Sequence, residues 1–334
     1  MAAMQIKRDE FRTLYAQAYE EYLSTEAGRA HLAFYASQRA EARANLEEIR
    51  AMQARGEDIT DAVLLKLLPY ADTPNNRAAG AWISITPSIN GNLQHWFERV
   101  KWTQRSEWPA IAQALLELVE RCTQDPTALA EACEAFAALP YSKGFQSGML
   151  SPILNAVSPD AFRIMNNKSR VTYNYLAGTD HGQALTDYAQ ANATAIQLCE
   201  ELKDVISSHT LLTDTRPDDA LDAFCHWLVA IRKLDFTPLK VLTQEQIDLL
   251  LGHVRRAFPD WTGFTDPRFI WHELQYKRNG AEKAAELLSE NELKRLLEAG
   301  EYDEIVSRVE QVGRASNLLF QSVPSSGDLN ILYQ

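Results

Sequence analysis

The residue types and spacings best suited to chemistry lie between positions 139 and 176 of this 334-residue chain. A first turn carries Lys143, Gly144, Gln146, Ser147 and Gly148 immediately before an apolar helical pattern. Backbone N–H groups at a helix start, together with the positive end of the helix dipole, can bind a phosphate group. We therefore predict that the first turn contacts the backbone of DNA.

A second turn precedes the next helical pattern and carries Asn166, Asn167 and Lys168, with Arg170 two residues further on. Side-chain amides pair with base edges, and a lysine ammonium binds a backbone phosphate. The stretch is locally +3, although the whole chain has 33 basic and 45 acidic residues and a net charge of −12. The alternative interpretation is a helix-turn-helix corner whose polar residues only cap helices.

Residues 95–108 form a third candidate stretch, in which aromatic and basic side chains alternate. Proteins use this combination to stack on bases and to contact a nucleic-acid backbone. We predict that Trp96 and Trp102 stack on a base. The alternative is that the aromatic rings face the core while the charges face water.

Candidates for acid–base chemistry are Asp180 and Asp187, which follow the second turn, together with Asn166 within it. Asp180 stands beside His181 in a glycine turn, so the two side chains could form a catalytic dyad. The simpler interpretation of this pair is a helix cap or a surface ion pair.

Composition excludes several classes of protein. Hydrophobic residues make up 46% of the chain, which is ample for a packed core. No apolar run is long enough to cross a membrane and no secretion signal is present, so a cytoplasmic protein is expected. The four cysteines are far apart and form no Cys-x-x-Cys, so neither a metal site nor a disulfide framework is predicted. Nucleotide-binding glycine motifs are also missing, and we expect no cofactor.

The pattern of apolar residues predicts a mainly α fold, a multi-helix bundle with small β elements near 80–86 and 317–333. Turn signals suggest three parts. Residues 1–57 would form an N-terminal helical hairpin, 58–210 a helical DNA-binding domain, and 211–334 a C-terminal helical domain ending in a short β hairpin.

Several strings between about residues 130 and 334 carry a resemblance to a known family: Gly144-Phe-Gln-Ser-Gly148-Met-Leu-Ser-Pro152, Asn166-Asn-Lys-Ser-Arg170, Leu185-Thr-Asp187-Tyr188, Phe224-Cys-His-Trp227 and Gly327-Asp-Leu-Asn-Ile-Leu332. They are similar to the N-terminal DNA-recognition regions of McrB-like AAA+ restriction ATPases of bacteria, whose motor is absent here. The resemblance implies recognition of modified DNA in defence against phage, with an ATPase or nuclease as a possible partner.

A weaker resemblance concerns residues 139–176. The string Leu139-Pro-Tyr-Ser-Lys-Gly144, a helix, and then Pro159-Asp-Ala-Phe-Arg-Ile-Met-Asn166 look like the helix-hairpin-helix DNA glycosylases. That family is largely helical and uses a catalytic aspartate, where this chain has Asn166. A glycosylase needs a carboxylate to stabilise the cationic sugar, so Asp180 or Asp187 would have to supply it. A Schiff-base lysine, Lys143 or Lys168, is a more distant alternative.

The expected function is therefore a bacterial anti-phage protein that binds DNA and recognises a modified, flipped base. It could be a DNA glycosylase that leaves an abasic site. The alternative is a non-catalytic reader or assembly module that acts with a McrB-like ATPase or nuclease. A helical scaffold with no role in DNA binding is the third interpretation.

Overall fold

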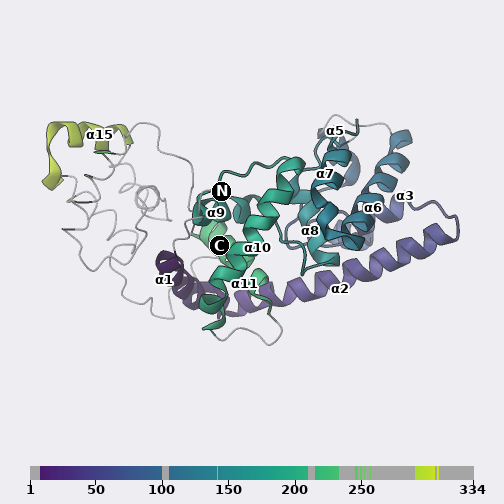
Figure 1. Ribbon diagram of the computed structural model, residues 1–334, viewed down its shortest axis with the longest axis horizontal. Coiled ribbons are helices and arrows are strands. Elements are labelled where there is room, and N and C mark those ends of the chain that lie inside the picture. Colours follow the sequence, from purple (N-terminus) through teal and green to yellow (C-terminus); the bar gives the residue numbers. More distant parts are fainter. Residues whose placement is uncertain are drawn as a thin grey trace. The chain divides into compact units, whose positions relative to one another are not determined.

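The computed structural model describes residues 8–99, 105–140, 142–209, 215–232 and 290–304, with a few single positions between 245 and 307. It is mainly helical, as the sequence predicts (Figure 1). The α-helices are α1 (Arg8–Ala18), α2 (Glu26–Ala54), α3 (Thr60–Lys66), α4 (Pro74–Ala78), α5 (Leu93–Arg99), α6 (Trp108–Gln124), α7 (Leu129–Ala137), α8 (Ser147–Val157), α9 (Asn167–Ala177), α10 (Tyr188–Ser207), α11 (Pro217–His226) and α15 (Glu290–Ala299). None of the described helices is long and apolar enough to span a bilayer.

The chain divides into two compact units, one containing residues 1–8 and 15–227 and the other residues 9–14 and 228–334. These boundaries differ from the three segments expected from the sequence. The reason is that α2 packs against both α8 and α11, which places most of the N-terminal hairpin and residues 215–227 in the same unit as the central helices. The first unit contains all the candidate residues from the first turn to the second.

A break near residue 24 separates α2 from the π-helical turn at Tyr19–Leu23. Thr25 caps α2, because its hydroxyl oxygen accepts the N–H of Gly28 at 3.2 Å and its hydroxyl donates to the carbonyl of Tyr22 at 2.6 Å. The chain passes so close to Gly28 that a Cβ there would lie 2.0 Å from the Tyr22 carbonyl oxygen. Glycine is therefore required at this position by space.

The long helix α2 has 29 residues and spans about 44 Å. It is the element on which α3, α8 and α11 pack (Figure 1). Helices α9, α10 and α11 pack on one another, and α6 packs on α3, α7 and α8. The core of the first unit contains fully buried aromatic side chains from these helices, among them Tyr35, Tyr188 and Phe224, together with Phe162 from the loop before α9.

The β element expected near 80–86 is an extended segment with single bridges. Tyr70 pairs in parallel with Ile83 and with Ile89. Trp82 is fully buried, and its indole N–H donates to the carbonyl of Gln38 on α2 at 3.0 Å. The β hairpin expected at 317–333 lies outside the described residues.

Ser88 joins this extended segment to α8. Pro152 lies inside α8 and has no N–H, so the carbonyl of Gly148 loses its helical donor. The hydroxyl of Ser88 donates to that carbonyl at 3.4 Å. The start of α8 is therefore tied to the segment that leads into α5.

Candidate functional site

The first turn lies between α7 and α8. Gly144 has a φ of +93°, a conformation that disfavours residues with a side chain, and it lets the chain reverse. Phe145 is buried, with its ring centroid 5.3 Å from those of both Phe136 and Trp96. Lys143 is exposed, and within the described part of the chain it forms no ion pair. The structure therefore has a turn between α7 and α8, as the sequence predicts, and one lysine of this turn is exposed.

The start of α8 is only partly open to a ligand. The backbone N–H of Ser147 donates to the carbonyl of Gln183 at 3.1 Å, and its side chain is 2% exposed. The preceding residue, Gln146, is exposed. One of the N–H groups predicted to bind phosphate is thus occupied by the chain itself.

The two predicted turns meet through Gln183. Its carbonyl accepts from Ser147, while its side-chain amide donates to Asn167 Oδ1 at 3.3 Å. Arg170 donates to the same oxygen at 2.9 Å and to the carbonyl of His181 at 3.0 Å. Through Gln183, in the loop after α9, this junction joins the turn before α8, which carries Lys143 and Gln146, to Asn167 and Arg170 of α9. We call these five residues the hairpin face.

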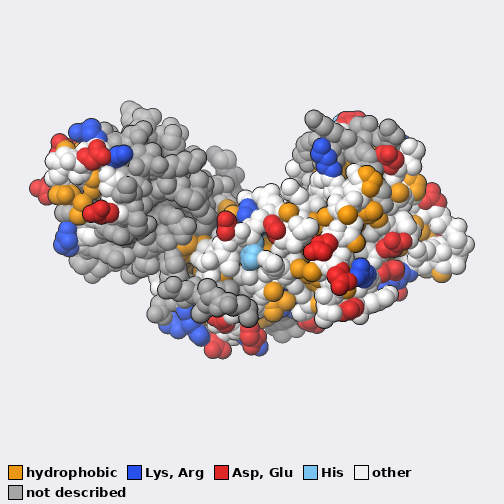
Figure 2. All heavy atoms as spheres, turned by 45° about the horizontal axis from the view of Figure 1, so that its top comes forward, with side chains coloured by type: hydrophobic (Ala, Val, Ile, Leu, Met, Phe, Trp, Pro, Cys, Tyr) orange, Lys and Arg blue, Asp and Glu red, His pale blue; other side chains and the backbone are white. Residues whose placement is uncertain are grey.

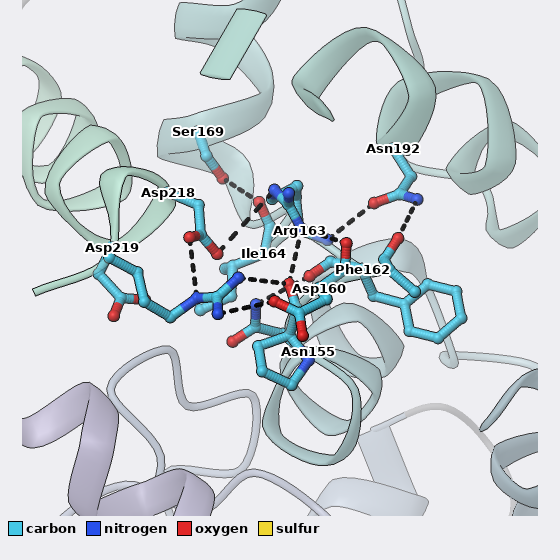
Figure 3. A network of polar contacts seen from close by, with 12 residues as sticks. Asn155, Asp160, Phe162, Arg163, Ile164, Ser169, Asn192, Asp218 and Asp219 are labelled. Atoms are coloured by element: carbon cyan, nitrogen blue, oxygen red, sulfur yellow. Dashed lines mark hydrogen bonds and ion pairs between the residues drawn. The ribbon is translucent and has the colours of Figure 1, made fainter. Parts of the chain in front are cut away.

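The loop between α8 and α9 is held rigidly by side chains of α8 and α10 (Figure 3). Asn155 donates to the carbonyl of Phe162 at 2.8 Å. Asn192 accepts from the N–H of Arg163 at 2.7 Å and donates to the carbonyl of Ala161 at 3.0 Å. Because its backbone groups are paired internally, the loop fixes the position of Asn166 at its end.

Two cations that the sequence places near the turns are half-buried and contact other parts of the chain. The side chain of Arg163 is 12% exposed, lies 3.9 Å from Asp218 and donates to the carbonyl of Pro159 at 2.6 Å (Figure 3). The ammonium of Lys168 lies 3.0 Å from Nδ1 of His226 on α11. The local charge of +3 is therefore divided among separate contacts, and we leave Lys168 out of the hairpin face because its ammonium contacts α11.

Asn166 is the N-cap of α9. Its Oδ1 accepts the N–H groups of Lys168 at 2.8 Å and Ser169 at 3.1 Å. Its Nδ2 donates to Oδ1 of Asp222 on α11 at 3.2 Å. The residue that replaces the expected aspartate is therefore itself in contact with a carboxylate, which comes from a helix 56 residues away.

Asp222 is 4% exposed, and its second oxygen accepts the hydroxyl of Tyr35 at 2.6 Å. Burial raises the pKa of Asp222 to about 6, and the Tyr35 hydrogen bond and the Lys168 charge oppose that shift. His31 lies on the other side of Tyr35, 3.4 Å from its hydroxyl. Burial, with the nearby His226 and Lys168, lowers the pKa of His31 to about 3.

A buried ion pair lies next to this cluster. Arg39 of α2 and Asp219 of α11 form a two-point contact, one bond of which is 2.8 Å long, and their side chains are 5% and 4% exposed. Arg39 also donates to Asn155 at 3.3 Å. Burial raises the pKa of Asp219 and the guanidinium of Arg39 opposes that rise. The pair joins α2, α8 and α11 in the interior of the first unit.

The two predicted catalytic carboxylates lie elsewhere. Asp180 is exposed in the loop after α9, and Asp187 stands at the start of α10. The described hydrogen bonds include none from either side chain to Asn166. His181, the partner considered for Asp180, instead has its Nε2 2.9 Å from the hydroxyl of Thr194, and burial lowers its pKa. The structure thus brings Asn166 to Asp222 and not to Asp180 or Asp187.

Of the two tryptophans predicted to stack on a base, the structure describes one, Trp96. Trp96 is 6% exposed, and its ring packs edge-on against Phe97 and Phe145, so the core interpretation accounts for it. Trp102 lies outside the described residues.

The acids of α11 were missed by the sequence analysis. Asp218, Asp219 and Asp222 are all buried. Acids in the first turn of a helix are usually solvated and favoured by the helix dipole. Their presence in the sequence therefore does not indicate that they are buried. The available signal was Asp222 itself, because it lies between Leu221 and Phe224, where an amphipathic helix has no need of a charge on its apolar side.

Within the described part of the chain, no group of three or more His, Cys, Asp or Glu side chains is arranged to hold a metal ion. Comparisons with protein families, with characterised proteins and with solved structures gave no significant match to this chain.

Proposed function

We propose that this protein binds DNA through the hairpin face and acts as a non-catalytic reader of modified bases. The observation that carries the proposal is the junction at Gln183, which joins the two turns singled out by their amides and cations. Lys143 supplies a charge for a phosphate, and Gln146 and Asn167 supply exposed amides. The resemblance to McrB-like recognition regions adds phage defence and an ATPase or nuclease partner to the proposal.

The test is DNA binding by the full chain, measured by fluorescence anisotropy at low salt with unmodified and 5-hydroxymethylcytosine duplexes of one sequence. We expect binding to both, tighter for the modified duplex, and weakened about tenfold by Lys143→Ala combined with Asn167→Ala. Arg43→Ala combined with Gln53→Ala serves as the matched control, because both residues are exposed on α2. Equal loss in the control pair, or no binding at all, would contradict the proposal.

A DNA glycosylase is the second candidate, and the contact of Asn166 with Asp222 is the observation that favours it. Asp222 would supply the carboxylate that the family resemblance places at Asn166. The reader ranks first because Asp222 is buried and both of its oxygens already accept hydrogen bonds.

The two candidates are separated by incubating the protein with modified DNA and then applying alkali. Strand breaks that appear only after alkali, and that disappear in Asp222→Asn but persist in Asp180→Asn and Asp187→Asn, would establish the glycosylase. Bound but intact DNA is the result expected of a reader.

A further inference from the structure

A groove of about 800 Å³ lies in the first unit between α3, the residues around α4, the turn before α5 and the start of α6. Its lining combines buried apolar side chains, Leu64, Tyr70 and Trp108, with exposed polar ones. This volume is within the range of about 300–1,000 Å³ typical of small-molecule sites. The groove is separate from the hairpin face and from the Asp222 cluster, since none of their residues lines it.

Amides dominate the polar part of the lining. Asn76 and Asn92 are used by the fold, since Asn76 donates to the carbonyl of Ala71 at 2.8 Å and Asn92 accepts the N–H of His95 at 2.9 Å. Asn75 and Asn90 are exposed, and in the described part of the chain their side chains have no hydrogen-bond partner. Each amide offers a donor and an acceptor side by side, which is the pattern that matches the edge of a nucleobase.

Arg105, whose guanidinium lies over the ring of Trp108, provides a cation for the phosphate of a nucleotide. The guanidinium of Arg105 lies 4.8 Å from the centroid of the Trp108 ring, is exposed, and forms no ion pair within the described residues. It is therefore free to bind a phosphate. Trp108 is 5% exposed, and its indole N–H is a buried donor that has no acceptor. Buried donors are normally paired, and this one is left without an acceptor among the described residues.

The groove is connected to the hairpin by a row of aromatic contacts. The ring of Trp108 lies 5.0 Å from Phe97, Phe97 lies 5.1 Å from Trp96, and Trp96 lies 5.3 Å from Phe145 in the first turn. Ser88, just before the turn at 90–92, also contacts the start of α8. The first turn and the groove are thus joined through one row of packed aromatic rings.

From these observations we infer that the groove binds a single nucleotide, with its base edge on Asn75 and Asn90 and its phosphate on Arg105. The inference deepens the proposed function and rests on it, since it assigns the place where a base of the bound DNA is read. The same chemistry would be offered by a free nucleotide, so the test must distinguish a free nucleotide from one carried on a strand.

The experiment uses isothermal titration calorimetry on the full chain with four probes: deoxynucleoside monophosphates, a single-stranded 12-mer, and the matching duplex with and without 5-hydroxymethylcytosine. The groove variant is Asn75→Ala, Asn90→Ala and Arg105→Ala combined, and all three side chains are exposed, so the fold should tolerate their removal. The matched control is Gln53→Ala with Arg43→Ala, exposed residues that do not line the groove.

We expect the groove variant to weaken single-strand or mononucleotide binding about tenfold and to abolish discrimination between modified and unmodified duplexes. Its affinity for unmodified duplex should stay within about twofold of wild type. Mononucleotide binding that depends on the groove, without any DNA binding, would support the groove and overturn the proposed function. DNA binding and base discrimination that are both unchanged in the groove variant would overturn the inference alone.

Discussion

Asp222 and His31 lie in one cluster but have opposite pKa shifts. The pKa of Asp222 is raised from 3.8 to about 6, so its contribution to stability is complete below pH 3.8 and is lost as the pH rises through 6. The pKa of His31 is lowered from 6.5 to about 3, so its contribution is complete above pH 6.5 and is lost as the pH falls toward 3. Between pH 4 and 6, a rise in pH therefore lowers the contribution of Asp222 to the free energy of unfolding and raises that of His31.

Removing one member of this pair should reveal the pH dependence of the other. For Asp222→Asn, the free energy of unfolding relative to wild type should rise with pH between 4 and 6, by at most about 1.4 kcal/mol per pH unit. For His31→Asn the sign should be reversed. Urea denaturation at several pH values measures how the difference in the free energy of unfolding changes with pH. A loss of packing that is the same at every pH does not alter this pH dependence. Parallel curves for wild type and both variants would show that neither pKa is shifted.

The ion pair of Arg39 and Asp219 gives a prediction about buried charge. Arg39→Leu leaves the Asp219 carboxylate buried without its partner, and we expect a loss of about 3–5 kcal/mol in the free energy of unfolding. The double variant Arg39→Leu and Asp219→Leu should recover most of that loss, because no unpaired charge remains. Arg43→Leu, at an exposed position of the same helix, is the control and should change stability little. A double variant no better than the single one would refute this account.

At the scale of elements, the start of α2 depends on the absence of a side chain at Gly28. Alanine normally stabilises a helix relative to glycine by about 1 kcal/mol. Here a Cβ would lie 2.0 Å from the Tyr22 carbonyl oxygen, so Gly28→Ala should instead destabilise the protein, by about 1–3 kcal/mol. Ala30→Gly, at an exposed position two residues later, measures the ordinary propensity effect in the same helix. A gain of stability in Gly28→Ala, measured by thermal unfolding, would mean that the turn can relax.

At the scale of the whole molecule, the charge distribution limits how DNA can be bound. The face of the first unit in Figure 2 carries scattered acidic side chains, with basic ones singly or in small groups among them. Of the four basic residues in 139–176, only Lys143 and Arg170 belong to the hairpin face, because Arg163 lies near the buried Asp218 and Lys168 contacts the half-buried His226. Binding should therefore depend on few phosphate contacts.

This leads to a prediction for the salt dependence. Two phosphate contacts correspond to a slope of about −2 in a plot of log binding constant against log salt concentration, whereas four would give about −3.6. Lys143→Ala should reduce the steepness by about 1, and Lys168→Ala should leave it unchanged. Anisotropy titrations between 50 and 200 mM salt provide the slopes. A slope near −3.6 that responds to Lys168→Ala would show that Lys168 leaves His226 to bind DNA.

The sequence by itself determined the features that depend on neighbouring residues. The helices at 8–54 and the two turns around Gly144 and Asn166 follow from signals a few positions apart, and the structure contains them. The mainly α fold follows from the same periodic patterns. These predictions succeed because capping and amphipathic spacing act within one or two helical turns.

Only the tertiary structure decided which side chains meet. Formal charges add up along a sequence, but α11 supplies partners for two of the cations, since Arg163 lies near Asp218 and Lys168 contacts His226. Asn166 reached Asp222 across 56 residues, and Trp96 became core because Phe145 packed on it. Such contacts depend on how helices distant in sequence pack on α2, and no local pattern encodes that arrangement.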